Sequence, residues 1–171
     1  MAPPSLDKEG AFFKGLRGVF VETTFIADSM LGRLAKWLRV LGYDTLHQPS
    51  YRQGVIGASV REGRKLLSRH RATVTRYANS MLIHSDHVKD QLDEMKKAGT
   101  IISERSRWFT RCLLCNVPLE KAEGTHARDN VPEYVFYQSA SGIRSCPSCH
   151  RYFWPGSHRE RMVGQLEEWG L

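Results

Sequence analysis

Length, composition and charge narrow the class of protein. The chain has 171 residues, which allows one domain or one domain with a small appendage. Its hydrophobic content of 41% is typical of a globular protein, and no run approaches the ~18 apolar residues of a membrane span. These features exclude membrane, fibrous and disordered proteins. Twenty-five Lys and Arg residues against 18 Asp and Glu give a net charge of +7, which predicts a polyanionic partner.

The N-terminal residues favour an intracellular protein. They contain no basic segment followed by an apolar one, as a secretory signal would require. We therefore expect a reducing compartment, either the cytoplasm or the mitochondrial matrix, which the sequence does not distinguish. The four cysteines should stay reduced there, and thiolates in such a compartment point to a bound metal.

Hydrophobic patterning predicts alternating strands and helices over the first hundred residues. Short apolar and β-branched runs indicate strands at 18–27, 43–47, 65–68 and 81–84. Apolar residues at helical spacing indicate helices at 29–41, 55–62, 71–78 and 87–98, the first capped by Asp28 or Ser29. This order predicts an α/β fold with a mostly parallel sheet flanked by helices. Sites in such sheets lie at the carboxyl ends of the strands, where we expect Asp28, Asp44 and residues 68–70.

Positive charge is concentrated between residues 33 and 76. That stretch holds ten basic residues against Asp44 and Glu62, a local balance of +8. Because an ordinary surface intersperses both signs, we expect an RNA-binding surface, with a generic solubilising surface as the alternative. The candidate RNA-binding residues are Arg33, Lys36, Arg39, Arg52, Arg64, Lys65, Arg69 and Arg71.

The four cysteines form the most specific motif. They make two C-x-x-C knuckles separated by thirty residues, Cys112 with Cys115 and Cys146 with Cys149. Two such turns complete a tetrahedral four-thiolate zinc site, which folds a module and leaves no open position for catalysis. A redox dithiol would need a single motif at a helix start, so it is the weaker alternative.

The segment after Ser103 therefore predicts a zinc ribbon. We expect residues 134–137 to form a strand of its hairpin, and the aromatic residues 152–154 either to stack on bases or to build a minimal core. His150 and His158 are interpreted as polar or RNA-facing side chains rather than ligands. The expected organisation is an N-terminal extension at 1–18, an α/β domain at 19–103, the ribbon at 104–160 and a C-terminal tail at 161–171.

Three segments carry a resemblance to a known family. Residues 25–45, the paired knuckles and residues 152–158 closely resemble the Mut-seven C-terminal RNase domain family, over most of residues 20–160. The resemblance implies a PIN-like nuclease fold with a C-terminal zinc ribbon and RNA as the substrate class. It also implies magnesium or manganese held by carboxylates at the carboxyl edge of the sheet. Asp28 and Asp44 match two of the family's acids and are the candidate catalytic residues.

The chain departs from the family pattern at the other acids. His70 stands where the family has an Asp after the third strand, and residues 50–54 contain no acid. Two carboxylates beside Arg52, Arg69 and Arg71 make a poor cation site, because the positive charge repels the ion, but a better phosphate site.

We therefore expect an RNA-binding protein whose acidic metal site is eroded. It would be a subunit or assembly factor of a ribonucleoprotein such as a ribosome, with protein partners in that complex. Two alternatives stay open. One is an active metal-dependent endoribonuclease that uses Asp28, Asp44 and a further acid such as Asp86 or Asp90. The other is a protein-interaction module whose basic face only aids solubility.

Overall fold

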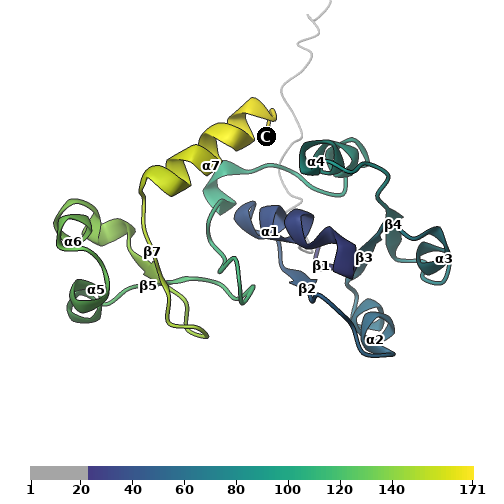
Figure 1. Ribbon diagram of the computed structural model, residues 1–171, viewed down its shortest axis with the longest axis horizontal. Helices are drawn as coiled ribbons and strands as arrows, with labels where there is room; N and C mark the ends of the chain where they lie inside the picture. The colour runs from purple at the N-terminus through teal and green to yellow at the C-terminus, as the bar shows by residue number, and fades with distance from the viewer. Residues whose placement is uncertain (1–22) are drawn as a thin grey trace, which may run out of the picture.

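In the computed structural model, which describes residues 23–171, a four-stranded parallel sheet organises the first half of the chain (Figure 1). The strand order is β2-β1-β3-β4. Its strands are β1 (Phe25–Ala27), β2 (Thr45–His47), β3 (Lys65–Ser68) and β4 (Ser80–Leu82). The parallel α/β fold is thus confirmed. Residues 18–22 of the expected first strand and the expected extension at 1–18 lie outside the described residues.

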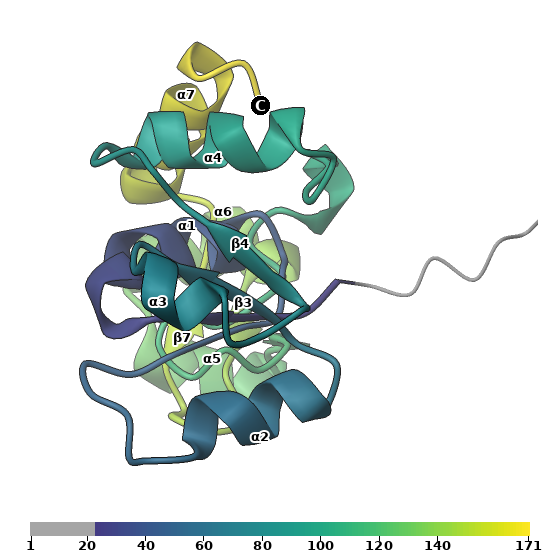
Figure 2. The ribbon, with the colours of Figure 1, turned by 90° about the vertical axis from the view of Figure 1, so that its right-hand side faces the viewer.

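Helices connect the strands and cover both faces of the sheet. They are α1 (Gly32–Val40), α2 (Val55–Arg61), α3 (Arg71–Val74) and α4 (Val88–Lys97), with the 3-10 turn η1 (Ser29–Leu31) before α1. Helices α1 and α4 lie on one side of the sheet and α2 on the other (Figures 1 and 2). Because both faces of the central strand are covered, all three residues of β1 are fully buried.

Several elements differ from the sequence prediction in their bounds, among them β2, which begins at Thr45 rather than at residue 43. Helix α3 ends at Val74 rather than at residue 78, and β4 begins at Ser80, one residue before the expected start. The Ser80 hydroxyl donates hydrogen bonds to the carbonyls of Val74 and Tyr77, which closes the connection between α3 and β4. The helix therefore ends early, because this turn ties its last residues to the following strand.

The second half of the chain begins with the turn η2 (Arg105–Arg107) and contains a small antiparallel sheet of order β5-β6-β7. Its elements are β5 (Glu120–Lys121), α5 (Gly124–Asn130), α6 (Glu133–Ser139), η3 (Ala140–Gly142), β6 (Arg144–Ser145) and β7 (Tyr152–Phe153). We call residues 105–156 the ribbon unit. They have their own core, in which Val131, Val135 and Ile143 are buried.

The expected strand at residues 134–137 is wrong, because these residues form helix α6. Val135 and Phe136 are adjacent in the sequence and both pack against the core of the ribbon unit, which the alternating faces of a strand would not allow. Glu133 also stands in the first turn, where a negative charge stabilises a helix. Tyr134 and Tyr137 point away from this core and are 63% and 66% exposed.

The segment 161–171, expected as a tail, continues helix α7 (Ser157–Glu168). This helix runs from the ribbon unit back over α1 (Figure 1). Met162 and Leu166 join the core of the α/β domain, and the ring of Trp169 lies 4.7 Å from that of Trp37. The C-terminal segment therefore ties the two halves of the chain together. Among residues 23–171, no helix is both long enough and apolar enough to cross a membrane.

Candidate functional site

The four cysteines converge on one point between the two knuckles. Their Sγ atoms all lie within 4.8 Å of one another, and those of Cys112 and Cys149 are 3.8 Å apart. A tetrahedral ion with metal–sulfur bonds of ~2.3 Å places its sulfur ligands about 3.8 Å apart. The donors therefore fit a structural metal such as zinc, as the spacing predicted.

The two knuckles share the same backbone geometry. The N–H of Cys115 donates to the Sγ of Cys112, and the N–H of Cys149 donates to the Sγ of Cys146, both at 3.4 Å. The next residue in each turn is left-handed, with φ of 64° at Asn116 and 58° at His150. Its N–H donates to the carbonyl of the first cysteine at 2.9 Å. This turn position explains His150, which is exposed, without any role as a ligand.

The thiols differ in how readily they ionise. Burial raises the pKa of the Cys112 thiol to about 12, whereas the backbone N–H of Arg151 lowers the pKa of the Cys149 thiol to about 7. A metal binds thiolates, so a cation at this point would have to displace a proton from Cys112. Metal binding at this cluster is therefore coupled to the release of the Cys112 proton.

Asp28 lies at the carboxyl edge of the sheet, as predicted, directly after β1. Its Oδ1 accepts from the N–H of Met30 at 2.9 Å and so caps η1. Its Oδ2 accepts from the Ser68 hydroxyl at 2.5 Å and from the N–H of Arg69 at 3.1 Å. The residue is only 9% exposed. The carboxylate thus joins the ends of β1 and β3, and three protein donors use most of its acceptor positions.

Two further acids near this edge are also engaged. Asp86 forms an ion pair with the guanidinium of Arg69, and Glu94 accepts hydrogen bonds from the backbone N–H groups of His84 and Ser85. Burial raises the pKa of Glu94, but these hydrogen bonds outweigh it and hold the pKa below its usual value. Within residues 23–171, the only set of three or more acids, histidines or cysteines placed to share an ion is the cysteine cluster. The carboxyl edge does not fit the implied magnesium or manganese site.

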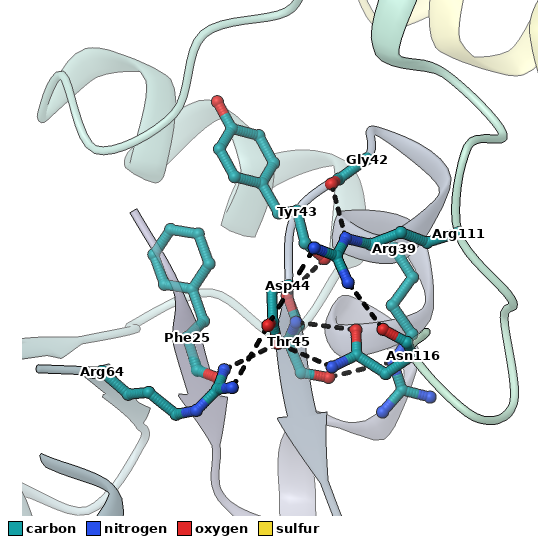
Figure 3. A network of polar contacts seen from close by, with 9 residues as sticks. All are labelled: Phe25, Arg39, Gly42, Tyr43, Asp44, Thr45, Arg64, Arg111 and Asn116. Atoms are coloured by element: carbon teal, nitrogen blue, oxygen red, sulfur yellow. Dashed lines mark hydrogen bonds and ion pairs between the residues drawn. The ribbon is translucent and has the colours of Figure 1, made fainter. Parts of the chain in front are cut away.

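Asp44 lies at the opposite edge, so its expected place beside Asp28 is wrong. Strand β2 begins only at Thr45, and Thr45 pairs with Phe25, the first residue of β1 (Figure 3). Asp44 therefore stands before its strand, whereas Asp28 stands after the neighbouring one. In parallel strands these positions are four residues apart along the sheet, which is about 13 Å at ~3.3 Å per residue. The two candidate catalytic acids cannot share one site at the carboxyl edge.

Asp44 is instead the centre of a polar network at the amino edge (Figure 3). Its Oδ1 accepts from Arg64 and from the side-chain amide of Asn116, both at 2.7 Å, and its Oδ2 accepts from Arg64 at 3.2 Å. Arg111 lies 4.0 Å away. Burial raises the pKa of Asp44, but these hydrogen bonds and charges outweigh it and hold the pKa below its usual value. Because Asn116 belongs to the first knuckle, the network joins that knuckle to β2.

Arg39 and Arg64, two of the predicted RNA-binding residues, are engaged with groups inside the protein. Arg39 is 8% exposed and donates to the carbonyls of Thr45, Leu113 and Leu114 at 2.8–3.1 Å. Arg64 is half-buried against Asp44 and the carbonyl of Phe25. Buried carbonyls need donors, and these long side chains supply them. The sequence does contain a signal for the burial of Arg39. This residue lies one helical turn after the core residue Ala35, on the same side of the helix.

The other candidate RNA-binding residues are spread over both edges. Four are exposed, namely Arg33, Lys36, Arg52 and Arg71. Lys65 is half-buried at the start of β3, and Arg69 is half-buried in its ion pair with Asp86. Among the predicted RNA-binding residues, these four therefore supply the positive charge that solvent can reach.

A small pocket brings the predicted residue Arg52 together with three residues that the sequence analysis did not single out, Tyr51, Arg76 and Tyr77. It has a volume of about 250 Å³ and is lined by Tyr51 and Arg52 on one side and Arg76 and Tyr77 on the other. Both arginines are exposed, no acid lines the pocket, and neither arginine has an ion pair in the described chain. The Tyr51 hydroxyl donates to the carbonyl of Ala27 at 2.7 Å, which fixes its ring. Two free guanidinium groups between aromatic rings can bind a phosphate.

The comparisons with known proteins agree with the fold described above. The family model described as Mut7-C RNAse domain matches residues 23–166. The match includes the whole parallel sheet, both knuckles and most of α7. No curated protein and no solved structure matches the chain.

Proposed function

Because the chain belongs to the Mut7-C RNAse domain family, we propose that it is an RNA-binding protein with a PIN-like fold and little or no nuclease activity. It acts as a subunit or assembly factor of a ribonucleoprotein such as a ribosome. Its ribbon unit holds structural zinc, which requires a reducing intracellular compartment.

The proposed loss of cleavage rests on one observation. The two acids that match the family, Asp28 and Asp44, lie at opposite edges of the sheet. Asp28 is engaged by three protein donors at the carboxyl edge, and Asp44 is held by Arg64 and Asn116 at the amino edge. Metal-dependent cleavage of RNA needs several carboxylates around one or two hard cations. The arrangement supports an eroded metal site rather than an active one.

The remaining charge supports RNA as the ligand. Arg52 and Arg76 line one pocket beside the start of α2, and Arg71 lies on the neighbouring helix α3. Exposed arginines without acidic partners bind a phosphate backbone, and such binding weakens steeply as salt releases the counterions. The same groups would repel a divalent cation.

The test measures binding and cleavage together. The purified, zinc-loaded full chain is incubated with labelled structured and single-stranded RNAs, with and without manganese. We expect salt-sensitive binding and no metal-dependent cleavage. Manganese-dependent cleavage that disappears in Asp28→Asn would establish an active nuclease, and absence of any RNA binding would favour a protein-interaction module.

A double charge reversal locates the binding surface. Arg52→Glu with Arg76→Glu should weaken binding of structured RNA on the order of tenfold or more and reduce the dependence on salt. The matched control is Lys121→Glu with Arg128→Glu, since both residues are exposed on the ribbon unit away from the pocket. Equal losses in the two double variants would show that only overall charge matters.

A further inference from the structure

A second cavity lies between the core of the ribbon unit, represented by Val135 and Trp154, and the residues Trp108 and Met162, which pack in the core of the α/β domain. It is an open groove of about 1,190 Å³, larger than the ~300–1,000 Å³ of ordinary small-molecule pockets. One wall contains Phe109 and the start of α7, and the other contains α6, β6 and β7 of the ribbon unit. We call this cavity the inter-unit groove. Its size suits a segment of a polymer rather than a metabolite.

Aromatic side chains supply much of its lining. Tyr134 on α6 is 63% exposed, and Phe153 and Trp154 are half-buried. Trp154 also packs against the core of the ribbon unit, which fixes its ring. Rings that are held from behind and open in front are platforms on which unpaired bases stack.

The charges along the groove favour an anion. The charged residues that line it are Arg111, Arg144, His158, Arg159 and Glu160. Arg111 is already engaged with Asp44 and backbone carbonyls, whereas Arg144 is exposed and has no acidic partner in the described chain. The guanidinium of Arg159 stacks over the Phe109 ring at 4.9 Å. The excess of arginine along aromatic walls is the combination that binds a nucleic-acid strand.

Unsatisfied donors lie at the same place. Helix α7 begins at the groove without a side-chain cap, so the N–H groups of its first turn have no intrahelical partner. Trp108, which lines the groove and is only 6% exposed, has no acceptor for its Nε1. The Nε of Arg159 is likewise buried without an acceptor within the described residues. A ligand rich in phosphate oxygens would supply acceptors for the N–H groups at the exposed start of α7.

From these observations we propose that the inter-unit groove binds a short single-stranded segment of RNA. Its bases stack against Tyr134 and Phe153, and its phosphates lie near Arg144, Arg159 and the N-terminus of α7. A duplex keeps its base faces covered, so only an unpaired strand can use the aromatic walls. The inference rests on the RNA binding proposed above and adds the form of the RNA and a second place where it is held.

The experiment compares two tyrosines on one helix. Affinities for labelled oligouridine and for a short RNA duplex are measured with the zinc-loaded full chain and with Tyr134→Ala, Arg144→Glu and Tyr137→Ala. Tyr134→Ala and Arg144→Glu should each weaken oligouridine binding about fivefold or more, since stacking and charge both contribute. Tyr137→Ala, equally exposed on α6 but outside the groove, should change it less than about twofold. Duplex binding should stay unchanged in Tyr134→Ala.

The outcomes separate this inference from the proposed function. Wild-type protein that binds neither RNA contradicts the proposed function and the groove together. Wild-type protein that binds RNA, with oligouridine affinity unaffected by Tyr134→Ala and Arg144→Glu, overturns the groove alone. Equal losses in Tyr134→Ala and Tyr137→Ala also overturn it, because they would show no specificity for the groove. Zinc content and far-UV circular dichroism confirm that every variant is folded.

Discussion

The two edges of the parallel sheet use the same residue types for different purposes. At the amino edge, Asp44 is surrounded by Arg64, Arg111 and Asn116, and Arg39 is buried close by. At the carboxyl edge, Arg52 follows β2 and is exposed beside a pocket that Arg76 also lines. The first edge is closed by the knuckle of the ribbon unit, and the second is open to solvent.

This difference shows how the direction of the strands assigns a role to each residue. An acid before a strand and an acid after its parallel neighbour lie at opposite edges, however close their sequence motifs look. Arginines at a closed edge donate to buried carbonyls and to Asp44. At the open edge Arg69 pairs with the exposed Asp86, whereas Arg52 has no ion pair within the described residues and remains available for a ligand. Four predictions test whether the closed edge is purely structural.

Removal of the metal should have the largest effect. Structural zinc sites contribute about 10–16 kcal/mol of apparent binding free energy, so Cys112→Ser should unfold the ribbon unit and expose the amino edge. Hydrogen exchange should then increase at residues 144–153 and at residues 43–47. His150→Asn is the control, because asparagine tolerates the left-handed turn, and it should retain one zinc per chain. Loss of zinc in that variant would make His150 a ligand.

Loss of the buried arginine should come next. Arg39→Met removes the donor to three carbonyls, so we expect the free energy of unfolding to fall by about 2–4 kcal/mol. Arg33→Met on the exposed face of the same helix should change it by less than about 0.5 kcal/mol. Denaturant unfolding followed by tryptophan fluorescence measures both. Equal effects would contradict the structural role of Arg39.

Neutralising Asp44 or Asp86 should distinguish the two edges by the size of the loss in stability. Asp44→Asn leaves Arg64 without its carboxylate, and with a side chain only 22% exposed we expect a loss of about 2 kcal/mol. Asp86 is 74% exposed in its pair with Arg69, so Asp86→Asn should cost less than about 0.5 kcal/mol. A larger effect at Asp86 would mean that the carboxyl edge is the more rigid one.

The smallest effect should appear in the pH dependence. The pKa of Asp44 is lower in the folded chain than in the unfolded one, so its contribution to stability is complete above about pH 4. That contribution is lost as the pH falls through the lowered value. The stability difference between wild type and Asp44→Asn should therefore be constant from pH 7 to about pH 5 and shrink below about pH 4. A difference that grows on acidification would contradict the ion pair.

Much of the fold was determined by the sequence itself. The apolar spacing predicted α1, α2 and the parallel sheet, and the two C-x-x-C turns predicted the cysteine cluster. These patterns are local, because a helix or a knuckle turn is specified by residues within a few positions of one another. The same patterns failed at residues 134–137, where a short apolar run fits either a strand or a buried helix face.

Only the tertiary structure decided what the charged residues do. Arg39 and Arg33 share helix α1, but only Arg39 lies where the ribbon unit closes on the sheet. Asp28 and Asp44 both flank strands, but only Asp44 lies at that contact. That contact joins residues more than seventy positions apart, so no local pattern reports it. A buried charge needs a partner inside the protein because its desolvation is costly, whereas an exposed charge can pair with a ligand. The sequence determined the chemistry available, and the long-range packing determined which charges remain exposed to a ligand.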